Sequence, residues 1–437
     1  MKAYSDMLLV YTYKITPRLS YIIRHIFTKM LLVEVEITTK VEDFIAHSGP
    51  KITYTRKPLQ NEFFIKSNDL LFEQGISDLE MVLYDWEGIP AFFPTNDKSA
   101  IPYDIFAASF YFLSRYEEYL PHVKDEHGRF PAEESLAMKH DFLDLPLVDI
   151  WVARFKIALQ RRFPDMVFGS REFRHTSIID VPVITKYLKR GIIRTMGGIG
   201  SEFLSLKFGL IWQRLMVLMR FKNDPYDIFE KLTLLHKTNQ VEALYFFLIA
   251  DYSTYDKNIS FNNPSFKVLV KSVADYSVVS LMASYKGFTD LGILKKERKR
   301  LISYINRPVK RVRQRFNRLN LPDTYRLMVE AEFNEDYTMG YTSHLGFRAS
   351  TCTPFFFYDI SFEEQIPLRV NPICIHYAAL ENEPSLKRAR ERVFEIENIV
   401  KKVHGTFNTV FSNNVINFDH YNPVTELYLS LIDKTQR

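Results

Sequence analysis

An aspartate at the end of a short apolar stretch is the first residue of this chain that could do chemistry. Residues Ser177–Asp180 read Ser-Ile-Ile-Asp, which is typical of a buried strand that presents an acid at its carboxyl end. Chemistry in α/β enzymes gathers at the carboxyl ends of parallel strands, so Asp180 is a candidate catalytic group. Pro182 follows two residues later, and a proline can neither donate a backbone hydrogen bond nor bind a metal.

The cysteines and histidines show no spacing that is typical of a metal site. Cys352 and Cys374 lack the CxxC pattern, so the sequence predicts neither a disulfide framework nor a zinc knuckle, and buried thiols in a reducing cytoplasm are expected. No pair among the eleven histidines has ligand spacing such as i and i+4 on one helix. Four in the second half come nearest to candidate chemistry: His175, His344, His376 and His404. Each is more typical of a surface or hydrogen-bonded histidine than of a ligand.

Length and composition favour a cytoplasmic protein of two domains. The chain has 437 residues, of which 46% are hydrophobic and 25% charged, as in ordinary soluble proteins. Its net charge of +5 is mild and does not by itself indicate a nucleic-acid partner. No apolar run approaches the ~20 residues of a membrane-spanning helix, and the N-terminal residues show no signal-peptide pattern. We therefore expect a cytoplasmic location without a transmembrane segment.

Two segments combine apolar or basic residues in a way that could serve binding. Residues 200–222 are apolar on more than one face and carry basic side chains, so they could form an interfacial membrane helix or a lid over the second domain. Residues 295–320 contain eleven basic residues and one acid, Glu297. That run could bind an acidic polymer, or it could be a solvated helix face.

The predicted order of strands and helices changes from residue 175 onward. The earlier part mixes strands with strong helices, which predicts an α+β domain. The later part alternates strands and helices, which predicts a parallel sheet or barrel. The expected strands of this later part are 177–180, 242–251, 276–284, 309–316, 335–341, 366–375 and 405–412.

Four segments, taken in order, resemble the bacterial polysaccharide deacetylase (NodB-homology) superfamily, in the subgroup with an extra uncharacterised N-terminal domain. They are IDVPVITKYLKRGIIRTMGG, YFFLIADYSTYDKNISFNN, VRQRFNRLNLPDTYR and EDYTMGYTSHLGFRASTCTPFFFYDI. The resemblance implies an α/β fold, with a smaller α+β domain over residues 1–167 and a distorted seven-stranded (β/α) barrel over 173–425. Active members of the superfamily remove acetyl groups from sugars with a divalent metal such as zinc.

The resemblance also implies that most motif positions are replaced in this chain. Asp180 falls on the family's catalytic base, and Pro182 falls on a metal-ligating aspartate. Met282 and Arg315 fall on histidine positions of the metal site, and Ser412 falls on the histidine that acts as the acid. Proline has no donor atom, a thioether is a poor ligand for a hard ion, and arginine is a permanent cation, so no bound metal is expected. Serine cannot act as a general acid at neutral pH.

Other family positions keep their residues, and these are our candidates for substrate binding. They are Asp336, Tyr337, Arg348 and Phe355. The resemblance implies that this region shapes the floor of the groove and that its arginine orients the catalytic aspartate. We therefore expect an Arg348–Asp180 pair, although the same residues could simply hold the barrel together.

Three functions follow from these observations. The first is a deacetylase-like protein without catalysis, which binds a carbohydrate or polysaccharide precursor or acts as a scaffold in bacterial surface polysaccharide metabolism. The second is an active carbohydrate deacetylase with a rearranged site around Asp180, Asp336 and Arg348. The third is a protein that contacts a membrane surface through residues 200–222, or an acidic polymer through 295–320.

Overall fold

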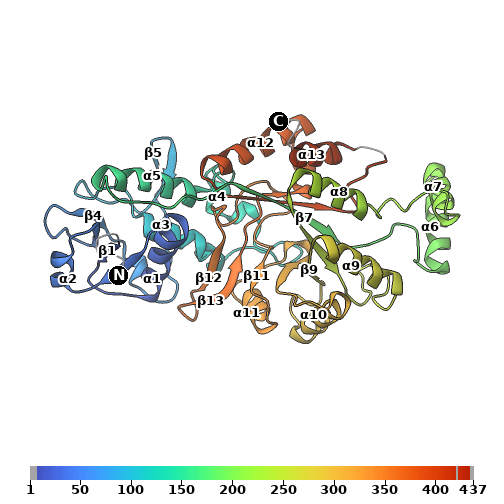
Figure 1. Cartoon of the computed structure of the whole chain (residues 1–437), viewed down its shortest axis with the longest axis horizontal. Helices are drawn as coiled ribbons and strands as arrows, with labels where there is room; N and C mark the ends of the chain where they lie inside the picture. Colours follow the sequence, from blue (N-terminus) through green and yellow to red (C-terminus); the bar gives the residue numbers. More distant parts are fainter. Residues whose placement is uncertain (1–6, 420–421, 434–437) are drawn as a thin grey trace.

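The computed structural model describes residues 7–419 and 422–433 of the chain (Figure 1). A small sheet with its helices lies at one end, a large sheet lies in the middle, and two helices, α6 and α7, project at the other end. The first residues of the predicted N-terminal domain and residues 420–421 of the predicted barrel, including His420, lie outside the described residues.

The small sheet has four parallel strands in the order β2-β1-β3-β4. These are β1 (Leu8–Tyr11), β2 (Val35–Thr38), β3 (Lys51–Thr55) and β4 (Phe63–Lys66). Helix α1 (Pro17–Arg24) connects β1 to β2, and α2 (Val41–Ala46) connects β2 to β3. These connections are those of an α/β unit, not of the α+β arrangement that the sequence predicted. An antiparallel hairpin follows, formed by β5 (Tyr84–Trp86) and β6 (Ile89–Ala91).

Helix α3 (Ile105–Leu113) is the centre of this part, because all nine of its residues are buried. Asp104 starts the helix by accepting hydrogen bonds from the backbone N–H groups of Phe106 and Ala107. The remaining helical segments here are a π-helix (His25–Met30), α4 (Leu136–Lys139), α5 (Leu147–Arg162) and three short 3-10 helices at Asp69–Leu71, Tyr116–Tyr119 and Ala132–Glu134.

The large sheet has nine strands in the order β12-β13-β11-β10-β9-β8-β7-β15-β14. They are β7 (Arg174–Val181), β8 (Glu242–Leu248), β9 (Val278–Ala283), β10 (Arg311–Gln314), β11 (Glu335–Asp336), β12 (Phe355–Asp359), β13 (Glu364–Val370), β14 (Ile375–His376) and β15 (Thr406–Ser412). Every pair is parallel except β12–β13. The fold is therefore α/β, as the sequence predicted.

The seven-stranded barrel that the sequence predicted is not formed as a closed structure. No strand pairing among the described residues joins β14 to β12, so the sheet remains open. The sheet still curls around an inner apolar cluster that includes Ile178, Phe246 and Met282. Its two ends approach each other where the Ile373 backbone N–H donates to the Met339 oxygen at 2.8 Å. Strands β11 and β14 have two residues each, which is too short for a continuous ladder to close the barrel.

Helices follow the strands and cover the sheet (Figure 1). They are α8 (Phe229–Asn239), α9 (Pro264–Tyr276), α10 (Leu291–Ile305), α11 (Asp323–Glu330), α12 (Leu386–Lys402) and α13 (Pro423–Ile432). The predicted apolar segment 200–222 contains the end of one helix, α6 (Ile192–Leu204), and the whole of another, α7 (Phe208–Leu218). Because this pair projects away from the body, it does not form the lid that was one of the two expectations (Figure 1).

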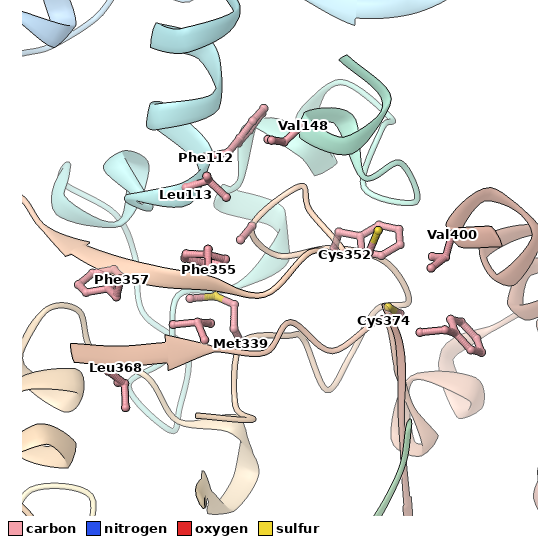
Figure 2. Close-up of a cluster of buried hydrophobic side chains, with 14 of the residues drawn as sticks. Phe112, Leu113, Val148, Met339, Cys352, Phe355, Phe357, Leu368, Cys374 and Val400 are labelled. Atoms are coloured by element: carbon pink, nitrogen blue, oxygen red, sulfur yellow. The ribbon is translucent and has the colours of Figure 1, made fainter. Parts of the chain in front are cut away.

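The N-terminal part and the large sheet share one hydrophobic core. Figure 2 shows Phe112 and Val148 on the N-terminal side facing Cys352 and Phe355 from the second half. A buried ion cluster crosses the same interface: Glu118 accepts hydrogen bonds from Arg348 Nε and Nη2 at 2.9 and 2.7 Å, and from Arg115 Nε at 2.8 Å. The two parts are therefore fixed to each other.

Replacing Glu118 with glutamine is expected to lower the free energy of unfolding by about 3 kcal/mol, because the buried Arg348 loses its carboxylate and the buried Arg115 keeps only that of Glu117. Urea denaturation at neutral pH measures this loss. Burial alone would raise the pKa of Glu118, but Arg348 and Arg115 lower it to about 2. An unfolded glutamate titrates at about 4.3. The stabilisation is therefore complete above that value and is lost as the pH falls toward 2, so the difference between variant and parent should shrink in acid.

Glu391→Gln is the matched control, because Glu391 is exposed and lies 3.5 Å from the equally exposed Arg388. Its loss should be below about 1 kcal/mol. Equal losses in the two variants, or a Glu118→Gln loss that does not change between neutral and acidic pH, would contradict the role of the ion cluster.

Candidate functional site

A pocket of about 430 Å³ lies at the carboxyl ends of the large sheet's parallel strands. Its lining brings together all five motif positions that the resemblance aligned: Asp180, Pro182, Met282, Arg315 and Ser412. The other lining residues are His127, Arg129, Phe316, Thr342, Ser343, His376, Tyr377, Ala378, Asn382 and Asn414. The positions of the replaced motif therefore do converge, although the residues that occupy them are unusual for catalysis.

Asp180 is held by a buried arginine from β10. Arg313 Nε donates to both carboxylate oxygens of Asp180, at 2.9 and 3.1 Å, and Arg313 Nη1 donates to the Tyr337 backbone oxygen at 2.6 Å. Burial raises the pKa of the Asp180 carboxyl, while Arg313 and Arg315 act in the opposite direction. The Asp180 carboxylate is thus engaged in an ion pair within the sheet.

Arg315 brings a second guanidinium into the pocket. Its Nε lies 3.3 Å from an Asp256 carboxylate oxygen, and its Nη1 lies 3.9 Å from the Met282 sulfur. The Asp256 carboxylate also accepts hydrogen bonds from the Ser253 hydroxyl at 2.8 Å and the Tyr285 backbone N–H at 3.2 Å. Burial lowers the pKa of Arg315, and Asp256 and Asp180 partly offset this effect. The Asp256 carboxylate is therefore shared by three donors, of which Arg315 is one.

The N-terminal part contributes one wall of the pocket. Arg129 Nη1 donates to the Phe316 backbone oxygen at 2.6 Å and to the Thr342 hydroxyl at 2.8 Å, and the His127 ring stacks on Phe316 with centroids 5.0 Å apart. These contacts could not be predicted from the sequence, because Arg129 lies 187 residues from Phe316 and 213 from Thr342, in a different predicted domain.

His376, at the end of β14, is a further lining residue whose place the sequence did not reveal. Its side chain is buried, and its Nδ1 accepts a hydrogen bond from the Ala378 backbone N–H at 3.2 Å. Burial and, secondly, the nearby Arg313 and Arg129 hold the pKa of His376 well below its usual range. The imidazole is therefore neutral at physiological pH and cannot serve as a charged acid.

The four predicted substrate-binding residues lie elsewhere. Asp336 is buried and accepts hydrogen bonds from the Tyr325 hydroxyl at 2.9 Å and the Thr338 backbone N–H at 3.0 Å. Tyr337 belongs to the inner apolar cluster, and Phe355 belongs to the shared core. The expected Arg348–Asp180 pair is wrong, since Arg348 binds Glu118 and Asp180 binds Arg313. None of the four is among the residues that line the pocket.

The residues of this pocket do not fit a divalent metal. In the part of the chain that the structure describes, no group of three His, Cys, Asp or Glu side chains is arranged to hold an ion. The guanidinium of Arg315 also stands beside Met282, where its fixed charge would repel a cation.

Comparison with known proteins gives a family for the N-terminal part only. Residues 8–164 match the model of a family described as "Family of unknown function (DUF7033)". No curated protein matches the chain.

Several solved structures share a distant likeness with this chain. One is a protein of Mycobacterium smegmatis named as a polysaccharide deacetylase, with 11% identity, a TM-score of 0.38, and coverage of 61% of this chain and 86% of that one. Another is a mutant of BA3943, a CE4 family pseudoenzyme with restored enzymatic activity, with 9% identity, a TM-score of 0.31, and coverage of 61% and 63%. The polysaccharide deacetylase Bc1974 of Bacillus cereus shares 11% identity, with a TM-score of 0.29 and coverage of 61% and 88%. Likenesses this weak establish neither an activity nor membership of the family.

Asp180→Asn is expected to lower the free energy of unfolding by about 3 kcal/mol, because it leaves the Arg313 guanidinium buried without a counter-charge. The double variant Asp180→Asn/Arg313→Met should recover part of this loss, since both partners of the pair are then removed. Urea denaturation of the parent, both single variants and the double variant gives the coupling between the two residues.

Asp251→Asn provides the control, because the exposed Asp251 also pairs with an arginine, Arg300, at 2.9 Å. We expect it to change stability by less than about 1 kcal/mol. Losses of the single variants that simply add in the double variant would show that Asp180 and Arg313 are not coupled.

Proposed function

We propose that this chain is a polysaccharide-deacetylase-like protein that has given up metal-dependent hydrolysis and binds an anionic carbohydrate. Such a protein would serve as a binding or scaffolding component of bacterial surface polysaccharide metabolism, in the cytoplasm. The observation that carries the proposal is the Arg315 guanidinium, which stands with Asp180, Pro182, Met282 and Ser412 around one pocket. The resemblance aligns Arg315 with a histidine of the metal site, so a fixed cation would stand where a hydrolase of this type needs a metal.

The lining of the pocket suits a carbohydrate. Thr342, Ser343, Tyr377, Asn382 and Asn414 offer hydroxyl and amide groups, which can donate to and accept from sugar hydroxyls. Aromatic surface is also present, because Phe316 and Tyr377 line the pocket and sugars pack on aromatic rings. This mixture of apolar rings and a few polar groups is usual for a small-molecule site.

The charges of the pocket favour an anionic group on that carbohydrate. Arg129 and Arg315 both reach the lining. Arg129 is paired with Asp125 at 2.6 Å and Asp180 with the buried Arg313, so Arg315 is the cation that an anionic group would contact. Asp256 lies near Arg315 but is also engaged by Ser253 and Tyr285. A carboxylate or phosphate could therefore accept two parallel hydrogen bonds from Arg315.

Hydrolysis is disfavoured by the same residues. Both carboxylate oxygens of Asp180 accept from Arg313, so little remains to take a proton from water. Ser412 stands at the expected acid position, and its hydroxyl is directed to the Asp180 backbone oxygen or the Asn414 side chain. The second candidate function is an active deacetylase with a rearranged site, favoured by the retained Asp180 and its raised pKa.

Binding of an oligogalacturonate and of its methyl ester, measured by titration calorimetry, tests the proposal. The charged sugar should bind at least about tenfold more tightly than the neutral ester, because a charge-assisted bidentate contact is worth roughly 1.5–3 kcal/mol. Arg315→Gln should remove that preference, while Arg388→Gln, which changes an exposed arginine on α12, should leave it intact.

Acetate release from acetylated chito-oligosaccharides distinguishes the second candidate function. The proposal expects none, with or without added zinc. Release by the parent chain would overturn the proposal, and its loss in Asp180→Asn under conditions where that variant is folded would establish an active deacetylase that uses Asp180.

A further inference from the structure

Helices α6 and α7 project from the large sheet on two connecting segments (Figure 1). We call the point where residues 186–188 meet Asp224 the base of this pair. The segment that carries them leaves the sheet at the end of β7 and returns at α8. Asp224 joins the outgoing and returning segments at the base, because its carboxylate accepts hydrogen bonds from the backbone N–H groups of Lys186, Tyr187 and Leu188 at 2.7, 2.8 and 3.1 Å. The projecting helices are thus attached through a defined structure.

The two helices are also joined to each other. Arg214 on α7 pairs with Glu202 on α6 through two contacts, of 3.0 and 2.5 Å. The Arg214 guanidinium lies 4.7 Å from the centre of the Tyr187 ring, and Gly198 leaves room for it, since a Cβ there would lie 2.6 Å from its Nη2. The Glu202 carboxylate is therefore neutralised by Arg214, whose guanidinium lies beside the Tyr187 ring.

Each helix also carries an apolar stripe. The stripe residues are Ile192, Met196, Ile199 and Phe203 on α6, and Phe208, Trp212, Leu215 and Met219 on and directly after α7. Both stripes follow the spacing i, i+4, i+7, i+11, which places the four side chains on one helix face. The rings of Phe203 and Phe208 lie 5.9 Å apart and connect the two stripes.

These stripes are open to solvent. The exposed fractions are 83% for Ile192, 66% for Met196, 60% for Phe203 and 63% for Trp212. A helix with such spacing normally buries this face against its own protein, and an apolar patch of this kind marks an interaction surface.

The charges around the stripes are almost all positive. Residues 186–222 contain eight Lys and Arg but one acid, Glu202, and that acid is neutralised by Arg214. Lys189, Lys207, Arg220 and Lys222 are exposed and lie before, between and after the helices. The apolar stripes are thus flanked by basic side chains.

We propose that the α6–α7 pair docks this protein on the surface of an anionic lipid bilayer. The stripes would enter the boundary between head groups and acyl chains, and the flanking lysines and arginines would contact lipid phosphates. A second copy of the chain fits less well, because it would bring the same positive charge against this surface. None of the helices in the described part of the chain is long and apolar enough to span a bilayer, so the contact would be peripheral. This inference does not depend on what the pocket binds.

Co-sedimentation of the full chain with vesicles of phosphatidylcholine, with and without phosphatidylglycerol, tests the docking. We expect binding to the anionic vesicles that weakens at high salt, and at least about tenfold weaker binding to phosphatidylcholine alone. The triple variant Met196→Ser/Phe203→Ser/Trp212→Ser should lose at least about tenfold in vesicle affinity, because its exposed apolar groups are removed. Its matched control, Ile157→Ser/Val268→Ser/Tyr276→Ser, removes three exposed apolar residues elsewhere and should bind as the parent does.

Trp212 supplies an independent readout, because the other two tryptophans, Trp86 and Trp151, pack in the N-terminal part. Anionic vesicles should shift the fluorescence to the blue, and Trp212→Phe should abolish the shift while keeping most of the sedimentation. Absence of binding by the parent chain, or equal binding by the two triple variants, would overturn the proposal. So would a dimer in sedimentation velocity that depends on the same three residues, since the stripes would then join two copies.

Discussion

A guanidinium group buried in a protein must find acceptors for its donors, and much of this structure is organised by that constraint. Arg18, Arg115, Arg313 and Arg348 are all fully buried. Three of them connect the N-terminal part to the large sheet: Arg18 binds Glu363, Arg115 binds the Arg348 backbone oxygen, and Arg348 binds Glu118. The fourth, Arg313, joins β10 to β7 through Asp180. These pairs specify how the two parts meet, because a shifted arrangement would leave buried charges without partners.

The same constraint explains why the pocket is unlike a hydrolytic site. Asp180 lies near the end of β7, where the resemblance implies a base, but it serves as the counter-ion of Arg313. Arg315 adds a second cation at the opening of the sheet, and Arg129 reaches the pocket because the interface holds the N-terminal part in place. In the proposed function, the positive charge that a metal would supply comes from these side chains. Such charge can orient an anion, but it cannot lower the pKa of a bound water as a metal does.

Much of the sheet, and less of the site, could be predicted from the sequence. Strands β8 and β9 are nearly continuous apolar runs, and β7 and β15 contain shorter apolar stretches, so the sequence pattern predicts all four. Strand β12, Phe355–Asp359, was missed because a run of aromatic residues has no alternation to distinguish a strand. Closure of a barrel could not be judged either, because it depends on two-residue strands such as β14.

Part of the candidate site could likewise be predicted from the sequence, and part could not. The five aligned motif positions do surround one pocket, since each lies at or near the end of a strand and parallel strands end at one edge. The partner of Asp180 was assigned to Arg348 and is Arg313, because a sequence does not show which of several arginines turns inward. His127 and Arg129 could not be found at all, since their place depends on how two separate parts of the chain pack.

The position of the α6–α7 pair relative to the pocket limits what the protein could bind if both proposals hold. Pro182 lines the pocket, and α6 begins ten residues later at Ile192. Ten residues of extended chain span at most about 36 Å. A docked pair of helices would therefore hold the pocket within about that distance of the lipid head groups. Ligands confined near the membrane, such as a charged sugar carried on a lipid, would then reach the Arg315 guanidinium at a higher local concentration than ligands free in solution.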